Sequence, residues 1–169
     1  MIDFHVHTTA SDGQYSPSEI IQLAKEKGLG AIAITDHDTV AGLEEGEKAA
    51  KEEGIRFIRG TELNIQWPTG EFHLLGLGLK EISPSLQEVL KNLQENRVER
   101  NFQMFELLKQ KYPELSWDEI TAMFPDTILG RPHFARYLVA KGIVKQNQVA
   151  FDRFLGKGRE CYVPRTGAN

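Results

Sequence analysis

The stretch Gly28-Leu29-Gly30-Ala31-Ile32-Ala33-Ile34-Thr35-Asp36 sets the architecture of the first half of the chain, because it recurs without a gap as Gly54-Ile55-Arg56-Phe57-Ile58-Arg59-Gly60-Thr61-Glu62. In each copy a glycine comes first, a stretch typical of a strand follows, and a threonine and an acidic residue close it. Such short apolar runs are typical of buried strands. Each copy predicts a strand, Ala31 to Thr35 or Arg56 to Thr61, that ends at a carboxylate.

Helical patterns alternate with these strands. Residues 2–7 predict a first strand, and Ser16-Pro17-Ser18-Glu19 predicts a helix start with a capping box, the helix ending at Gly28. A second helix is expected from Leu43 to Glu53. This order predicts an α/β fold with parallel strands, in a sheet or barrel whose C-terminal strand ends surround one open mouth.

The simple alternation ends after Glu62. Residues 63–67 and 71–77 flank Pro68-Thr69-Gly70, which predicts a hairpin with His73 on its return strand. From Ser83 the apolar residues follow a helical period, which predicts an inserted helical subdomain. Its later elements are expected as helices from a capping box at Ser116 to Pro125, from Pro132 to Gly142 and over 146–155, and as a strand over 160–164.

Composition restricts the class of protein. The 169 residues are 40% hydrophobic and 26% charged, as in an ordinary globular domain. The single Cys161 excludes a thiol-rich zinc site, so a metal would be held by His, Asp and Glu. The absence of a targeting or membrane-length apolar segment predicts a cytoplasmic protein without a membrane partner. A net charge of -4 disfavours binding of stable duplex nucleic acid but leaves room for a local phosphate pocket.

Four of the five histidines fall at or near the strands of the first half: His5, His7, His37 and His73. Taken alone, the alternating His5 and His7 could equally be structural, and a lone His73 among apolar residues is more typical of a core. Their gathering favours a metal site. Histidine with carboxylate suits zinc, manganese or iron.

Three ionisable residues, Asp36-His37-Asp38, follow a buried strand, where they cannot all be buried cheaply without a cation or partner. We expect His37 to bind metal directly, while Asp36 and Asp38 stay open between ligation, helix capping and orienting an imidazole. Glu62 is expected to be a ligand, bridging two ions, by its equivalence to Asp36 in the repeat. Asp12 falls near the same mouth, although Asp12-Gly13 alone indicates only a turn.

A site with several ions lowers the pKa of a bridging water and neutralises charge on a phosphoryl group, which predicts phosphate ester hydrolysis by a metal-bridging hydroxide. Neither a Walker-type phosphate loop nor a Gly-x-Ser-x-Gly elbow is present. Arg131 and His133 at a helix N-terminus are candidates for substrate phosphate, the alternative being a helix cap with a packed imidazole. Lys157 and Arg159 form a weaker candidate, because basic loops flanked by glycine are often only solvated.

The chain resembles the PHP (polymerase and histidinol phosphatase) superfamily. The resemblance rests on His5-Val6-His7-Thr8-Thr9-Ala10-Ser11-Asp12-Gly13, Thr35-Asp36-His37-Asp38, Gly60-Thr61-Glu62 and Phe72-His73-Leu74-Leu75-Gly76. Residues 130–136 and 156–164 resemble the phosphoesterase branch that includes nucleoside 3′,5′-bisphosphate phosphatases and a 5′→3′ exoribonuclease.

The resemblance implies an incomplete distorted (β/α)7-type barrel and two or three divalent ions: Mn²⁺ first, with Fe²⁺ or Zn²⁺ as alternatives. By position, His5, His7 and Glu62 would hold one ion, Glu62 and His73 another, and Asp12 and His37 the third. Asp12, His37 and Glu62 are the implied catalytic residues, and Arg131 and His133 would face the substrate. The implied substrate is a phosphate ester of a nucleotide or short oligonucleotide.

The resemblance also implies later ligands that the chain lacks, since no histidine follows His133. A closed eight-unit barrel needs about 250 residues. We therefore predict residues 1–82 as the N-terminal part of the barrel, 83–155 as the inserted subdomain and 156–169 as a truncated return to the barrel. A missing C-terminal segment or a second chain is expected to complete it. The alternative function is a non-catalytic fragment that binds metal or nucleotide.

Overall fold

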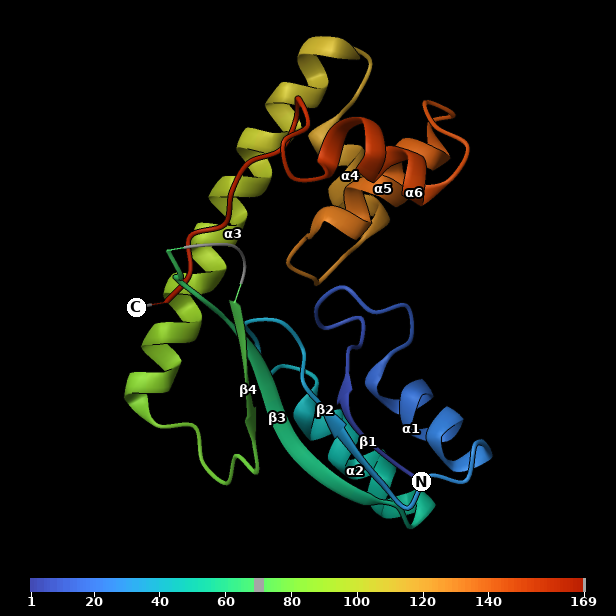
Figure 1. Ribbon diagram of the computed structural model, residues 1–169. Helices are drawn as coiled ribbons and strands as arrows, with labels where there is room; N and C mark the ends of the chain where they lie inside the picture. Colours follow the sequence, from blue (N-terminus) through green and yellow to red (C-terminus); the bar gives the residue numbers. More distant parts are fainter. Residues whose placement is uncertain (69–71, 169) are drawn as a thin grey trace. The chain divides into compact units, whose positions relative to one another are not determined.

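The computed structural model describes residues 1–68 and 72–168 (Figure 1). The chain forms two compact units. Residues Met1–Gln94 with Thr166–Asn169 make the first, which we call the sheet unit, and Glu95–Arg165 make the second, the helical unit. Helix α3 (Pro84–Lys111) begins in the sheet unit and ends in the helical unit.

A curled four-stranded half-barrel forms the frame of the sheet unit, with the strands in the order β1-β2-β3-β4 (Figure 1). β1 pairs with β2 and β2 with β3 in parallel, while β3 and β4 are antiparallel. The predicted α/β class and the hairpin pairing are confirmed. Residues 69 and 70 of the expected turn and residue 71 of the expected return strand lie outside the described part. The strand bounds are Ile2–Val6 for β1, Ala31–Ile34 for β2, Arg56–Ile65 for β3 and Phe72–Leu77 for β4.

Helices α1 (Pro17–Glu26) and α2 (Leu43–Glu53) pack on each other and against the strands. Ser16 and Glu19 form the predicted capping box, and Gly54 ends α2 with a φ of 68°. A Cβ on Gly46 of α2 would lie 2.6 Å from the Ile34 side chain, so glycine is what lets α2 approach β2. The buried residues of this layer are Ile21, Ala24, Ile32, Ala50 and Ile55.

Two strand predictions are wrong in detail. The expected strands 56–61 and 63–67 are one continuous strand, β3, because it pairs with β2 along its first part and with β4 along its second. Residues 160–164 form no strand: Tyr162 donates its backbone N–H to Arg159, and Pro164 has no N–H to give to a ladder. The chain instead meets the sheet at Ala168, which bridges Ile65.

The helical unit holds the C-terminal part of α3 followed by α4 (Trp117–Met123), α5 (Arg131–Ala140), α6 (Asn147–Ala150) and the π-helical turn η1 (Phe151–Leu155). The predicted helix 146–155 is thus α6 and η1, because Gly156 donates its N–H to the carbonyl of Phe151, five residues earlier (2.8 Å). The core of the helical unit includes Met104, Phe105, Phe134, Leu138 and Leu155.

Only half of the capping box predicted at Ser116 forms. The Ser116 hydroxyl accepts from the Glu119 N–H, but the Glu119 carboxylate accepts from the Tyr137 hydroxyl (2.8 Å) and from Lys141 (2.9 Å) instead.

Among the described residues no helix has the length and apolarity that crossing a membrane requires.

The two compact units divide at Gln94/Glu95 and at Arg165/Thr166. Since α3 is one continuous helix across the first of these points, no chain break marks a boundary there. The three predicted segments stay a prediction.

Candidate metal centre

One carboxylate in the sheet unit is surrounded by four imidazoles. Glu62 on β3 is 3% exposed, and its Oε2 atom lies 2.8 Å from His7 Nε2 and 3.1 Å from His5 Nε2. The same oxygen lies 3.2 Å from His37 Nδ1, and Oε1 lies 2.9 Å from His73 Nδ1. The structure thus brings together the four histidines that the sequence placed at or near the strands of the first half.

Strand order and direction produce this convergence. The C-terminal ends of the parallel strands β1, β2 and β3 meet at one edge. His37, just beyond β2, forms a parallel backbone β-bridge with Glu62 on β3. His5 and His7 project to the same side because they are two residues apart along an extended chain. The antiparallel β4 sets His73 opposite Asn64, one diagonal step from Glu62.

Asp12 reaches the cluster from the loop after β1. Its Oδ1 lies 3.0 Å from His7 Nδ1, and its Oδ2 lies 3.8 Å from His37 Nε2. The loop folds back tightly, since Thr8 accepts backbone hydrogen bonds from Ser11 (3.1 Å) and Gly13 (2.9 Å). This turn is what brings a side chain five residues away next to His7.

Three groups of side chains have donor atoms within 4.8 Å of one another: His5, His7 and Glu62; His7, Asp12 and His37; and His37, Glu62 and His73. Each group shares residues with the next. Donors that each lie about 2.0–2.2 Å from one ion have this spacing.

Burial and charge set the protonation of the cluster. Burial alone would raise the pKa of Glu62, but the close imidazoles of His7, His73 and His37 outweigh it and hold that pKa far below its usual range. Burial lowers the pKa of His7, yet its contacts with Asp12 and Glu62 raise the net value to about 9. A neutral imidazole has one N–H, whereas both ring nitrogens of His7 face carboxylates. The imidazole of His7 therefore holds a second proton when no cation competes for its nitrogens.

The donor set fits divalent metal ions. His7 Nε2 is buried and lies 2.8 Å from Glu62 Oε2, yet the angle is not that of a hydrogen bond. Nitrogen and oxygen atoms that converge without hydrogen-bond geometry are the arrangement expected around a shared cation. The mixture of imidazole and carboxylate suits manganese, iron or zinc.

Asp36 and Asp38, left open by the sequence, lie outside the three donor groups. Asp36 accepts hydrogen bonds from the Thr8 N–H (2.7 Å), the Thr8 hydroxyl (2.7 Å) and the Ser11 hydroxyl (2.6 Å). Asp38, with a φ of 55°, accepts from the backbone N–H of Asn64 (2.9 Å). Through these hydrogen bonds Asp36 holds the loop after β1, and Asp38 holds the backbone of β3 beside Glu62.

The predicted substrate residues Arg131, His133, Lys157 and Arg159 all belong to the helical unit. His133 is 2% exposed, and its Nδ1 accepts from the Gly130 N–H at the start of α5 (2.8 Å) while its ring packs edge-on against Phe124. These contacts match the helix-cap alternative. Arg131 lies over the Tyr162 ring, 5.7 Å from its centroid. A role in substrate binding stays a prediction for all four residues.

Sequence reasoning missed Thr8 and Ser11 as supports of the centre. Both are at most 1% exposed, although they lie in a polar loop. The spacing of hydroxyls before Asp12 is the only signal in the sequence, and it resembles any turn.

A half-barrel that collects histidines and carboxylates at the C-terminal ends of its strands defines a class of metal-site protein. The family model described as "PHP domain" matches residues 3–155, and the chain belongs to this family. Among curated proteins, a 5′-3′ exoribonuclease of Haemophilus influenzae is 37% identical over 161 residues, covering 95% of this chain and 58% of that protein. A 3′,5′-nucleoside bisphosphate phosphatase of Chromobacterium violaceum is 35% identical, covering 99% and 59%.

Two solved structures share the fold. An amidohydrolase from Chromobacterium violaceum with bound sulfate and no metal superposes with a TM-score of 0.89 at 34% identity, covering 99% of this chain and 60% of that one. A protein from Bifidobacterium adolescentis, provisionally named a metal-dependent phosphoesterase, gives 0.93 at 31% identity, covering 99% and 59%. The chain thus spans about 60% of the length of these relatives.

Proposed function

We propose that the chain carries part of a metal-dependent phosphoesterase active on a phosphate ester of a nucleotide or short oligonucleotide. The observation that supports this most is the buried Glu62 carboxylate with four imidazole nitrogens at 2.8 to 3.2 Å. Burying one carboxylate among so many ring nitrogens costs free energy unless protons or cations are shared among these groups. Membership in the PHP family agrees with the proposal.

In the proposed site, Glu62 holds two ions, since it belongs to two donor groups. His5 and His7 complete the first group and His37 and His73 the second. Asp12, with His7 and His37, would hold a third ion. We assign catalytic roles to Asp12 and Glu62, the two carboxylates of the donor groups, and to His37, which belongs to a group with each of them.

Divalent ions, when bound, supply Lewis-acid activation of water and neutralise phosphoryl charge. Manganese is the ion we propose first, with iron or zinc as alternatives. Without the ions, His7 holds a proton between Asp12 and Glu62, so binding of an ion must displace it. His7 thereby links occupancy of the site to pH.

The names of relatives support the nucleotide part of the proposal, one being a nucleoside bisphosphate phosphatase and another an exoribonuclease. Arg131, Lys157 and Arg159 supply cations in the helical unit that suit phosphate groups. We propose His133, at the start of α5, as the fourth substrate-binding residue. We propose a cytoplasmic location, since one cysteine in 169 residues suits a reducing compartment.

A phosphate-release assay tests the proposal. The purified chain is incubated with Mn²⁺ and a nucleoside 3′,5′-bisphosphate, beside Glu62→Gln and the exposed control Glu44→Gln. We expect release by the chain and the control, and loss in Glu62→Gln. Equal release by all three would contradict the proposal.

A second candidate is a metal- or nucleotide-binding fragment without turnover. It is favoured by the size of the donor groups, each of which holds three residues, fewer than the six positions of an octahedral manganese ion. Metal binding without phosphate release in the same assay would select it.

A further inference from the structure

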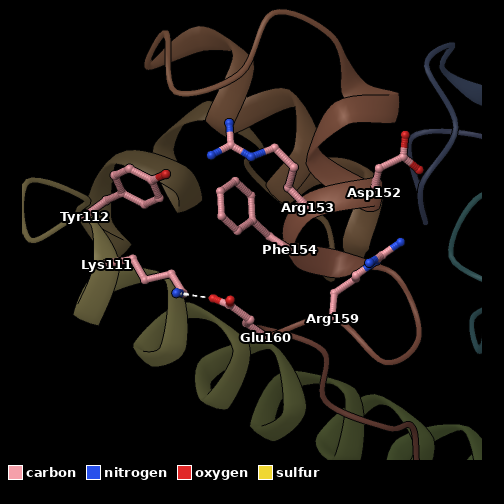
Figure 2. Close-up of a pocket in the computed structure, with 7 residues that line it drawn as sticks. All are labelled: Lys111, Tyr112, Asp152, Arg153, Phe154, Arg159 and Glu160. Carbon is pink, nitrogen blue, oxygen red and sulfur yellow. Dashed lines mark ion pairs between the residues drawn. The ribbon is translucent and has the colours of Figure 1, made fainter.

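The helical unit contains a polar pocket that shares no residue with the metal centre (Figure 2). It encloses about 590 Å³. Three cations line it, Lys111, Arg153 and Arg159, together with the carboxylates of Asp152 and Glu160. The rings of Tyr112 and Phe154 complete the lining and pack edge-on, with centroids 5.7 Å apart.

Irregular backbone positions this lining. Asp152, Arg153 and Phe154 lie on the π-helical turn η1, a conformation found frequently at functional sites. The loop that follows contains Gly158 with a φ of 77°, and it returns Arg159 and Glu160 to the pocket. Cys161 then donates its backbone N–H to Phe154 (3.1 Å), which closes the loop onto η1.

Each carboxylate of the pocket has a hydrogen-bond or ion-pair partner, whereas neither arginine is paired with a carboxylate among the described residues. Glu160 pairs with Lys111, and Asp152 accepts from Gln148 (3.0 Å). Arg153 lies over the Phe154 ring, 4.9 Å from its centroid, and in the described part of the chain Arg159 makes no ion pair. Two guanidinium groups are therefore available to an anion.

We propose that this pocket binds a nucleotide through its phosphate group without requiring a metal ion. Guanidinium groups bind phosphate through paired N–H donors, and two of them line one pocket here. The choice of a nucleotide, rather than another phosphorylated molecule, rests on the proposed function.

The size and the other lining groups suit more than a bare anion. A volume of about 590 Å³ falls within the range of sites for small organic ligands, roughly 300–1,000 Å³. The half-buried Tyr112 ring offers an apolar face to a sugar or base. The carboxylates of Asp152 and Glu160 provide acceptors for ribose hydroxyls or base amino groups.

Nucleotide binding measured in EDTA, which removes metal ions, tests this pocket independently of the metal centre. The probes are adenosine monophosphate, followed by calorimetry, and a fluorescently labelled single-stranded tetraribonucleotide, followed by anisotropy. The variant Arg153→Gln/Arg159→Gln is compared with Lys48→Gln/Lys145→Gln, which removes two exposed cations elsewhere. His37→Ala is measured in the same way, and thermal melting checks that each variant folds.

We expect the arginine variant to bind both probes at least about tenfold more weakly, because each lost charge-assisted hydrogen bond lowers affinity by about this factor. The salt dependence of tetranucleotide binding should fall by about one unit in log–log slope. The lysine control and His37→Ala should bind like the unchanged chain. Weakening of the tetranucleotide alone would assign the pocket to oligonucleotides, and weakening of both probes to the nucleotide unit itself.

Three results would overturn the proposal: no binding of either probe, equal weakening in the lysine control, or loss of binding in His37→Ala. Failure of the proposed hydrolysis is distinguishable, since it would appear as missing phosphate release with Mn²⁺ while binding in EDTA persists. If the arginine variant melts early, backbone NMR shifts at Gly156 and Gly158 on titration of adenosine monophosphate into the unchanged chain provide the second readout. Unmoved signals there would count against the pocket.

Discussion

The carboxylate of Asp36 accepts two hydrogen bonds from Thr8, one from its backbone N–H and one from its hydroxyl, both at 2.7 Å. Asp36 is 1% exposed and lies two residues beyond the end of β2, while Thr8 lies two residues beyond the end of β1, in the loop that carries Asp12. The pair thus joins the ends of two neighbouring strands. Asp36 positions a proposed metal ligand while lying outside the donor groups itself.

Asp36→Asn should destabilise the chain by roughly 1–3 kcal/mol, because an amide leaves at least one buried donor of Thr8 or Ser11 without an acceptor. Urea unfolding monitored by circular dichroism measures this. The matched control is the exposed Glu26→Gln, which should change stability by less than about 0.5 kcal/mol. Equal stability of the two variants would show that the Asp36 contacts carry no weight.

Glu62→Gln should weaken metal binding about 100-fold, since among the described residues Glu62 is the only carboxylate that belongs to two donor groups. Metal content after dialysis against Mn²⁺, Fe²⁺ or Zn²⁺, measured by mass spectrometry, gives the stoichiometry and the preferred ion. Glu44→Gln serves as the control with the same chemical change. Retention of metal by Glu62→Gln would place the ions elsewhere.

The His7 pKa of about 9 predicts opposite pH trends with and without metal. This pKa is raised above the ordinary value of 6.5, so in EDTA the contribution of His7 to stability is present below pH 6.5 and is lost as pH rises to about 9. Metal affinity should rise over the same range, by up to about tenfold per pH unit for the one displaced proton. Thermal melting in EDTA and calorimetry with Mn²⁺ between pH 6.5 and 9 measure the two trends.

His7→Gln is the control for this prediction. It should flatten the pH dependence of melting in EDTA over that range. An unchanged slope in His7→Gln would assign the effect to another group.

Gly13→Ala should distort the loop that carries Asp12. An added Cβ would lie 2.4 Å from the His7 carbonyl oxygen, a contact with backbone that requires the loop to move. We expect a loss of roughly 1–3 kcal/mol and weaker metal binding. Gly30→Ala is the matched control, since its Cβ would meet only the Met1 carbonyl at 3.8 Å. Similar stability and metal content in both variants would contradict the prediction.

Local patterns predicted much of the sheet unit. The capping box at Ser16, the end of α2 at Gly54 and the strand starts at Ala31 and Arg56 depend on neighbours in sequence, and they match the structure. The helical unit was predicted less well. The π-helical turn η1 and the pairing of Glu119 with Tyr137 and Lys141 depend on packing between segments far apart in the chain.

The sequence by itself determined which side chains stand at strand ends, because alternation and glycine-bounded apolar runs are local properties of the chain. Only the tertiary structure decided that Glu62 lies at the centre of four histidines, that Asp36 supports the loop of Asp12, and that Arg153 and Arg159 share a pocket. Those relations depend on strand register and loop return. Register and loop return follow from hydrogen bonds and packing between distant segments, which no local pattern specifies.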